Sequence, residues 1–152
     1  MKALLQRVTH ASVSVNGEIT GSIKRGLVVL VGVANGDTIK DAQYLAPKIA
    51  SLRIFSDSDG KFNLSCLDIK GELLVISQFT LLADARKGRR PSFTNAAPPN
   101  KAEELFNQFL DQVKSTGLKV ETGRFQTHML IEIHNDGPVT IILDSREKSL
   151  IS

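Results

Sequence analysis

Near its start the sequence reads Ala11-Ser12-Val13-Ser14-Val15-Asn16-Gly17, and this stretch indicates the class of fold. Apolar and polar residues alternate with a period of two, which is typical of a β-strand with one buried face. Asn16-Gly17 then supplies the positive φ angles that a tight hairpin requires, and residues 18–23 are expected to form the returning strand. The stretch therefore predicts a β-hairpin within a larger sheet.

Further strands are predicted on both sides of this hairpin. Residues 2–9 lead into it, and residues 27–33 and 73–77 are nearly continuous in aliphatic side chains, as in strands covered on both faces. Residues 129–134 and 139–143 are predicted to form a second hairpin. The chain is thus expected to be rich in strands that pair with their neighbours in sequence.

Two helices complete the expected fold. The first covers residues 38–52, with Asp37 as its N-cap and a kink at Pro47. The second is capped by Asn100 and ends at Gly117. Because strands outnumber helices and hairpins link several of them, the predicted class is α+β. Two main helices would pack against mostly antiparallel sheet in a barrel-like or sandwich-like arrangement.

Length and composition exclude several classes of protein. With 152 residues the chain can bury a core without disulfides or metals, and we expect one domain over residues 1–152, with 144–152 as a tail. The net charge of +3 is compatible with a nucleic-acid partner but does not require one. The single cysteine, Cys66, suits a reducing compartment. No apolar stretch reaches the ~20 residues of a membrane helix, so a cytoplasmic protein is expected.

Residues 56–60 read Ser-Asp-Ser-Asp-Gly and resemble part of a calcium-binding loop. Phe55 and Cys66 stand where such a loop needs oxygen ligands, however. Aspartate and glycine also favour turns through local hydrogen bonds and backbone freedom. We therefore predict a turn here, and neither a metal ion nor another cofactor is expected.

Four cations gather in one short segment of the chain. They are Arg86, Lys87, Arg89 and Arg90. Such a concentration of positive charge can bind phosphate groups, because arginine offers two parallel donors to one phosphate. The alternative is an ordinary solvated loop, and the sequence alone leaves both interpretations open.

The segment Ser77-Gln78-Phe79-Thr80 follows a predicted buried strand and carries three polar side chains. Ser77 or Thr80 can provide a nucleophilic hydroxyl, or the backbone amides can bind an oxyanion. The alternative is a strand edge whose polar side chains face water. No Gly-x-Ser-x-Gly turn surrounds Ser77, which excludes the α/β-hydrolase arrangement.

The sequence Asn135-Asp136-Gly137-Pro138-Val139-Thr140 joins the two strands of the last predicted hairpin. A plain turn is the simplest interpretation. Bonds before proline are cis in only about 5–6% of cases, so a trans bond is expected from the sequence alone. A Gly-Pro pair is nevertheless unusual in a hairpin, which leaves open a role for its carbonyl groups.

Taken together, six segments resemble the D-aminoacyl-tRNA deacylase family in their order and spacing, from residue 1 to about residue 143. They are Gln6-Arg7-Val8, Arg53-Ile54-Phe55-Ser56-Asp57, Ser77-Gln78-Phe79-Thr80-Leu81, Arg90-Pro91-Ser92-Phe93, Thr122-Gly123-Arg124-Phe125 and Asn135-Asp136-Gly137-Pro138-Val139-Thr140. The Ser-Gln-Phe-Thr and Asn-x-Gly-Pro-x-Thr blocks are specific as a pair. The resemblance implies an editing hydrolase that cleaves the ester between a tRNA 3′ end and a D-amino acid or glycine.

The resemblance also implies a homodimer whose active site lies at the subunit interface. Its Gly-Pro pair is cis and reaches into the other subunit's pocket, where two carbonyl oxygens distinguish D from L. The residues that match are Gly137 and Pro138 for chirality, Arg7 as their support, the amides of Gln78, Phe79 and Thr80 beside Ser77 for catalysis, and Ala102, Phe125 and Met129 for the walls. The tRNA 2′-hydroxyl is expected to handle the proton, and Thr80 to position the substrate.

Two other classes of function remain as alternatives. A nucleic-acid-binding module without catalytic activity, for example one that binds DNA, would use residues 86–90. In an editing deacylase the same residues are expected to steer the tRNA acceptor end. A serine or threonine hydrolase of small esters would use Ser77 or Thr80. Only an editing deacylase gives a specific use to both the Gly-Pro pair and the Ser-Gln-Phe-Thr segment.

Overall fold

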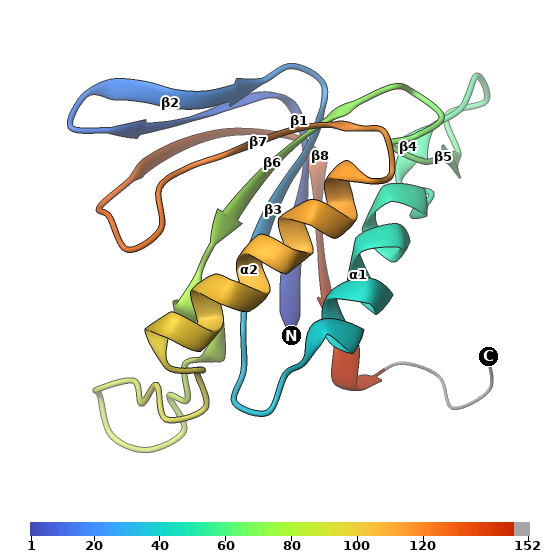
Figure 1. Cartoon of the computed structure of the whole chain (residues 1–152). Coiled ribbons are helices and arrows are strands. Elements are labelled where there is room, and N and C mark those ends of the chain that lie inside the picture. The colour runs from blue at the N-terminus through green and yellow to red at the C-terminus, as the bar shows by residue number, and fades with distance from the viewer. Residues whose placement is uncertain (148–152) are drawn as a thin grey trace.

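The computed structural model describes residues 1–147, and it places two helices on one face of a curved sheet (Figure 1). Strand β1 (Lys2–Val15) lies at the centre of the antiparallel part. It pairs with β2 (Glu18–Ile23), β3 (Gly26–Gly32) and β8 (Leu130–Asp144), each antiparallel to it. The hairpin predicted at Asn16-Gly17 is confirmed, because β1 and β2 meet there and both residues have positive φ.

The rest of the sheet is parallel, so the sheet is mixed: the predicted antiparallel arrangement holds for the three pairings of β1 but not for the two pairings of β6 (Glu72–Ser77). Strand β6 pairs in parallel with β3, and β7 (Lys119–Thr122) pairs in parallel with β6. A Cβ atom on Gly21 of β2 would lie 2.9 Å from the carbonyl oxygen of Thr122 in β7. The two ends of the sheet therefore approach each other, and the mixed sheet is nearly closed into a barrel.

The second hairpin predicted near the C-terminus is wrong, because residues 130–144 form one strand. Asn135 pairs with Val8 and Thr140 pairs with Gln6, so four residues of β8 lie opposite the single residue Arg7. The strand bulges out over residues 136–139 and then returns to its partner. Strand β1 is long enough to pair with β8 on both sides of this bulge.

Helix α1 (Ile39–Ser51) begins one residue later than Asp37 would have placed it. Thr38 is the N-cap, in a capping box with Asp41, and the helix continues through Pro47 to Ser51. Asp37 instead turns inward, where its carboxylate lies 2.7 Å from the Met1 ammonium and accepts a hydrogen bond from the Ala34 amide. The Met1 ammonium comes close to Asp37 only in the folded chain. Because Asp37 binds it, Thr38 caps the helix instead.

Helix α2 (Pro99–Lys114) also begins differently from the prediction. Pro99 occupies the first helical position, where a missing N–H costs no hydrogen bond, so Asn100 lies inside the helix rather than at its cap. At the other end, Gly117 has the positive φ angle expected after a helix, and its amide donates to the Lys114 carbonyl.

The helices and the two faces of the sheet enclose separate hydrophobic clusters. On β3, Leu27 and Val29 pack into the cluster beneath the helices, whereas Val28 packs into a smaller cluster on the opposite face. Such burial on both faces was the prediction for residues 27–33.

Neither of the two α-helices in residues 1–147 has the length and apolar composition that a membrane-spanning helix requires.

Two shorter elements lie at the margins of the sheet. Strands β4 (Phe55–Ser56) and β5 (Phe62–Leu64) form a small hairpin, and the predicted turn between them is confirmed, because the Asp57 carboxylate accepts from the Asp59 and Lys61 amides. The predicted tail, residues 144–152, includes the short 3-10 helix η2 (Ser145–Glu147). Its remaining residues, 148–152, lie outside the described part of the chain.

Candidate active site

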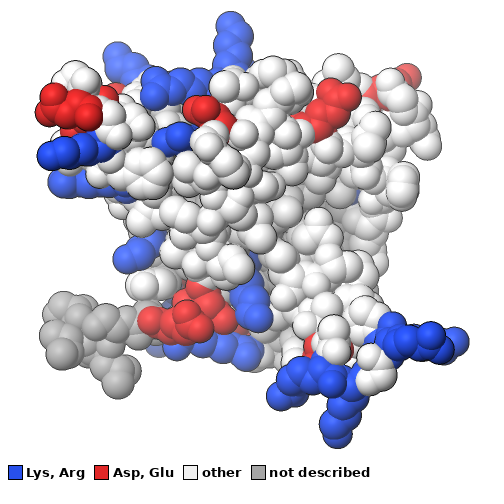
Figure 2. All heavy atoms as spheres, turned by 180° about the vertical axis from the view of Figure 1, so that it is seen from behind, with Lys and Arg blue, Asp and Glu red and all other residues white. Residues whose placement is uncertain are grey.

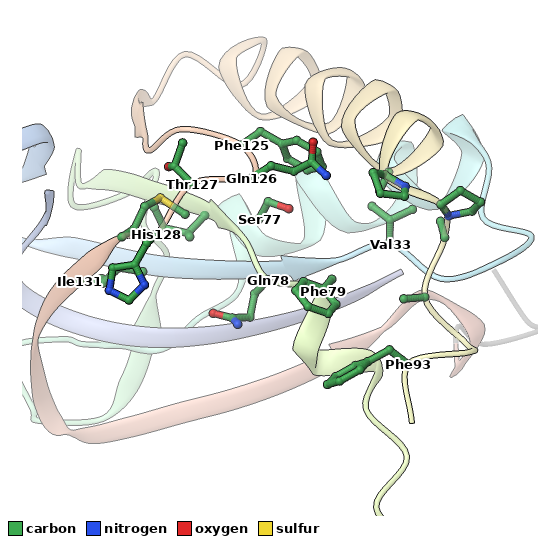
Figure 3. A pocket seen from close by; sticks show the side chains of 17 residues that line it. Val33, Ser77, Gln78, Phe79, Phe93, Phe125, Gln126, Thr127, His128 and Ile131 are labelled. Atoms are coloured by element: carbon green, nitrogen blue, oxygen red, sulfur yellow. The ribbon is translucent and has the colours of Figure 1, made fainter. Parts of the chain in front are cut away.

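A cavity of about 640 Å³ opens where β6 ends and the chain enters the 3-10 helix η1 (Phe79–Leu82). Its walls come from the end of β6, the segment 93–99, the first turns of α2 and the segment 125–131. Figure 3 shows Phe79 and Phe93 toward one end of this cavity and His128 toward the other. The lining is mainly apolar with a few polar groups, which is typical of a site for a small ligand group.

Six residues singled out from the sequence meet in this cavity. They are Ser77, Gln78, Phe79, Ala102, Phe125 and Met129. Thr80 follows directly, and its hydroxyl accepts a hydrogen bond from the Gln78 side-chain amide. Residues separated by about fifty positions in the sequence thus line one space.

Only two of the three predicted backbone amides are free to bind a ligand. The Gln78 N–H donates to the Val31 carbonyl oxygen at 2.7 Å, because Gln78 continues the pairing of β6 with β3. The N–H groups of Phe79 and Thr80 have no acceptor among residues 1–147. An oxyanion-binding role can therefore fall on Phe79 and Thr80, but not on Gln78.

The cavity does not contain an assembled pair of nucleophile and base. Neither the Ser77 nor the Thr80 hydroxyl forms a hydrogen bond to a histidine or a carboxylate within residues 1–147. His128 lines the cavity without such a bond, and the rings of His10 and His134 stack on each other, with centroids 3.6 Å apart. The arrangement gives no support to a serine or threonine nucleophile activated by a neighbouring base.

The Gly137-Pro138 pair lies in the bulge of β8, and its peptide bond is cis rather than trans. The neck of the bulge is closed by Asn135, whose side-chain oxygen accepts from the Val139 amide at 3.0 Å. The Asn135 side-chain nitrogen donates to the Thr140 hydroxyl at 2.9 Å. These bonds hold residues 136–139 as a compact projection from the strand.

Arg7 holds this bulge from the opposite strand. Its Nε donates to the Asp136 carbonyl oxygen at 3.0 Å, and a terminal nitrogen donates to the Ile54 carbonyl oxygen at 3.0 Å. The guanidinium also lies 5.4 Å from the ring centroid of Phe62. Because only 11% of the Arg7 side chain is exposed, its position is closely defined.

The bulge and the cavity are far apart within one chain. Neither Arg7 nor the Gly-Pro pair lines the cavity. On β1, Arg7 faces the bulge and Ser14 pairs with Leu130 beside the cavity. Seven residues of strand correspond to about 23 Å at ~3.3 Å per residue. Within one chain, the residues predicted as walls therefore line the same cavity, whereas Gly137 and Pro138 lie away from it.

The predicted cationic segment is an exposed loop between Asp84 and Ser92, which are joined by two backbone hydrogen bonds of 2.8 Å. Arg86 binds the Asp84 carboxylate with two nitrogens, at 2.9 and 2.7 Å, and this pairing lowers the pKa of Asp84 to about 2. The other three cations, Lys87, Arg89 and Arg90, have no polar partner among the described residues. Figure 2 shows basic side chains projecting together at one lower corner of the molecule.

Sequence reasoning missed part of the cavity. Phe93 lines it and packs against Phe79 in an edge-to-face pair with ring centroids 5.1 Å apart. Both rings remain partly exposed, at 56% for Phe79 and 38% for Phe93. His128 and its neighbours Gln126 and Thr127 were also missed. Phe93 stood in one of the segments that carried the resemblance, and that was the only signal for it.

Comparison with known proteins places the chain among close relatives. Residues 4–144 match the family model described as D-Tyr-tRNA(Tyr) deacylase. A protein of Dehalococcoides mccartyi named D-aminoacyl-tRNA deacylase is 60% identical over 148 residues, which cover 97% of each chain. A solved structure of a c-Myc DNA unwinding element binding protein is 44% identical, with a TM-score of 0.89, and covers 95% of this chain and 98% of that one.

A second solved structure has a similar fold although its sequence is only 15% identical to this chain. It is described as a probable eukaryotic D-amino acid tRNA deacylase. The TM-score is 0.81, with 93% of this chain and 97% of that chain covered. At this identity the likeness concerns the fold alone, and it supports the mixed, nearly closed sheet with two helices.

Proposed function

This chain belongs to the D-Tyr-tRNA(Tyr) deacylase family, and we propose that it hydrolyses the ester of D-aminoacyl-tRNA, releasing free tRNA and the D-amino acid. It is a hydrolase by this membership. The observation that carries the proposal is the cavity at the end of β6, which gathers Ser77, Gln78 and Phe79 with the predicted walls. One deacylase domain over residues 1–152, acting in the cytoplasm, is part of the same proposal.

We further propose that a second copy of the chain completes the site. The carbonyl oxygens of Gly137 and Pro138 would accept hydrogen bonds from the α-ammonium of the substrate. Within one chain they lie about 23 Å along the strand from the cavity, while the bulge projects from the sheet. A homodimer, in which each bulge enters the partner's cavity, reconciles these two observations.

Such a site would distinguish D from L by contact with the main chain. Inverting the α-carbon exchanges the hydrogen and the side chain, so an L residue cannot seat its ammonium, ester and side chain together. It would collide with the wall or leave buried polar groups unpaired, and a hydrogen-bonding site can reject such a misfit by ~10⁴-fold. Glycine has no side chain to collide, so we expect glycyl-tRNA to be accepted.

Catalysis would depend on the free amides of Phe79 and Thr80. Negative charge develops on the ester carbonyl oxygen during attack, and each preorganised donor is worth about 2.7–4 kcal/mol in such sites. The 2′-hydroxyl of the tRNA would handle the proton, because neither Ser77 nor Thr80 has a base within hydrogen-bonding distance in residues 1–147. The Thr80 side chain, bonded to Gln78, would position the substrate.

The tRNA end would meet two features, one at the cavity and one on the other side of η1. The exposed rings of Phe79 and Phe93 offer a surface on which the terminal base can stack. The loop with Arg86, Lys87, Arg89 and Arg90 would attract the acceptor stem through its charge. Neutralising all four should then weaken the salt dependence of deacylation at limiting substrate.

Separate incubation with D-Tyr-tRNA and L-Tyr-tRNA tests the proposed activity. We expect cleavage of the D ester alone. Cleavage of both esters at similar rates would indicate a general esterase. Cleavage of neither would favour a module that binds nucleic acid, a second candidate supported by the 44% identical DNA unwinding element binding protein.

A further inference from the structure

A second, polar cavity of about 360 Å³ lies on the other side of η1 from the candidate active site. Leu82, at the end of η1, lines it together with residues 83–86, whereas Phe79, at the start of η1, lines the first cavity. The segment that follows the cationic loop also contributes to both cavities: Phe93 lines the first and Asn95 lines the second. In Figure 3 the chain runs away from the first cavity beyond Phe79 and Phe93.

The second cavity has more cations than carboxylates around it. Lys2, Arg86 and Arg146 line it together with one carboxylate, Asp84, and the buried Asp37 carboxylate lies 3.9 Å from Arg146. The Asp84 carboxylate is already bound by two nitrogens of Arg86, which leaves the third nitrogen of this guanidinium without a partner in residues 1–147. The side chain of Lys2 likewise has no ion-pair partner among the described residues.

Hydrogen bonds to Asn35 hold two of the residues that line this cavity, Asn95 and Arg146. The Asn35 amide donates to the Asn95 carbonyl oxygen at 2.9 Å, and the Asn35 side chain donates to the Thr94 carbonyl oxygen at 2.8 Å. The Asn35 carbonyl oxygen accepts from Arg146 at 2.8 Å. The guanidinium of Arg146 is thereby oriented, and the same nitrogen lies 3.9 Å from the Asp37 carboxylate. Its other two nitrogens have no acceptor among residues 1–147.

We propose that this second cavity binds a backbone phosphate of the tRNA substrate, close to the 3′ end. Three cations with spare N–H donors match the oxygens of a phosphodiester, and arginines held by carbonyl or carboxylate groups need little reordering to bind it. A phosphate retains part of its hydration, which suits a polar and open site. The inference rests on the proposed function, since the phosphate belongs to the same tRNA substrate whose ester occupies the first cavity.

The spacing of the two cavities fits this assignment. From Phe79 to Leu82, the three steps of η1 span about 6 Å at ~2.0 Å per residue. A stacked nucleic-acid strand advances ~3.4 Å per nucleotide, so this distance corresponds to about two nucleotides. With the esterified ribose in the first cavity, the second would hold a phosphate one or two nucleotides before it.

The test compares two substrates that share the ester but differ in phosphates. D-Tyr-tRNA carries the backbone, whereas 3′-O-D-tyrosyl-adenosine carries the ester and terminal base without a phosphate. We expect the double variant Lys2→Gln/Arg146→Gln to lose about tenfold in kcat/KM on D-Tyr-tRNA through a higher KM. The slope of log(kcat/KM) against log[salt] should become shallower by about 0.7 for the lost phosphate contact. On D-tyrosyl-adenosine its rate should equal that of the wild type.

A matched variant, Lys48→Gln/Lys114→Gln, removes the same charge from exposed positions that line neither cavity. It should keep the wild-type kcat/KM and salt slope on both substrates. An equal loss on both substrates in the Lys2/Arg146 variant would overturn the phosphate site, since it would indicate damage to the fold or to the ester site. Unchanged kinetics on D-Tyr-tRNA would overturn it as well.

Failure of the proposed function would be recognised separately, because the wild-type protein would then hydrolyse neither D-Tyr-tRNA nor D-tyrosyl-adenosine. In that case, binding of a 5′-phosphorylated CCA trinucleotide tests the phosphate site directly. We expect at least fivefold weaker binding to the Lys2→Gln/Arg146→Gln variant than to the wild type. Equal binding to the two proteins would overturn the inference.

Discussion

The guanidinium of Arg7 donates a hydrogen bond to the carbonyl oxygen of Asp136, 3.0 Å away, immediately before the Gly-Pro pair. A second bond from the same guanidinium reaches the Ile54 carbonyl oxygen. One side chain therefore links the bulge of β8 to the chain that leads into β4. The proposed chiral filter requires rigid carbonyl groups, and this link supplies part of that rigidity.

Replacing Arg7 should weaken both deacylation and the fold. Arg7→Ala frees the bulge from its two hydrogen bonds, so kcat/KM on D-Tyr-tRNA should fall at least tenfold. Each lost bond from a charged donor should also lower the free energy of unfolding by about 1.5–3 kcal/mol. Arg7→Lys should rescue little, because one ammonium cannot span two carbonyl oxygens on different segments. Steady-state kinetics together with thermal unfolding would check this. Wild-type kcat/KM in Arg7→Ala would contradict a supporting role.

A methyl group at Gly137 should damage the site directly. Its Cβ would lie 2.8 Å from a Val139 methyl carbon and 3.1 Å from an Arg7 nitrogen, at a φ of +131°. We expect Gly137→Ala to lower kcat/KM by about 100-fold. Gly60→Ala is the matched control, since Gly60 also has positive φ but open space around it. If both variants lost activity equally, backbone strain alone would explain the effect.

The hydroxyl of Thr80 should not be needed for the chemical step. It is bonded to the Gln78 side chain and has no neighbouring base in residues 1–147. We therefore expect Thr80→Ala to retain activity within about tenfold of the wild type, because the amides of Phe79 and Thr80 stay in place. Ser77→Ala tests the other hydroxyl in the same way. A rate at background in a folded variant that still binds substrate would establish Thr80 as the nucleophile or proton carrier.

Cys66 should be inert in the folded protein. It is fully buried, and burial raises the pKa of its thiol to about 12. Because the thiolate is the reactive form, a thiol reagent at pH 8 should modify the native protein very slowly and react at once after unfolding. Reactivity in the native state should still increase with pH above about 9, where a thiol of ordinary pKa is already largely ionised. Rapid modification of the native protein at pH 8 would show that the thiol is accessible.

The sequence predicts the strands better than their pairing. Alternation from Ala11 to Val15 and the Asn16-Gly17 turn are local signals, and the hairpin they predict is present. The parallel pairing of β3, β6 and β7 depends on which distant strands meet, and no local pattern reports that. This is why the parallel part of the sheet could not be identified from the sequence.

The bulge shows a second limit of local patterns. Gly137-Pro138 interrupts an alternating stretch, as a hairpin turn would, and the sequence alone favours that interpretation. The deciding factor is β1, a strand of 14 residues that pairs with β8 on both sides of the interruption. A long partner strand elsewhere in the chain thus converts an expected turn into a bulge.

The candidate site was predictable mainly through resemblance. The resemblance implies that Ala102, Phe125 and Met129 are walls of the substrate pocket. The three residues line one cavity, and their contact with a substrate stays a prediction. The contact of Phe93 with Phe79 could not be predicted, because it depends on how the loop after η1 folds back.

A mixing experiment tests most directly whether one chain lends its Gly-Pro pair to another. Gly137→Ala lacks a working bulge, and Ala102→Phe would fill the cavity. If the site is shared between subunits, random mixing places one intact cavity opposite one intact bulge in half of the dimers. The account predicts that mixing two inactive variants restores about a quarter of wild-type activity on D-Tyr-tRNA. A mixture as inactive as either variant alone, although mixed dimers have formed, would contradict it.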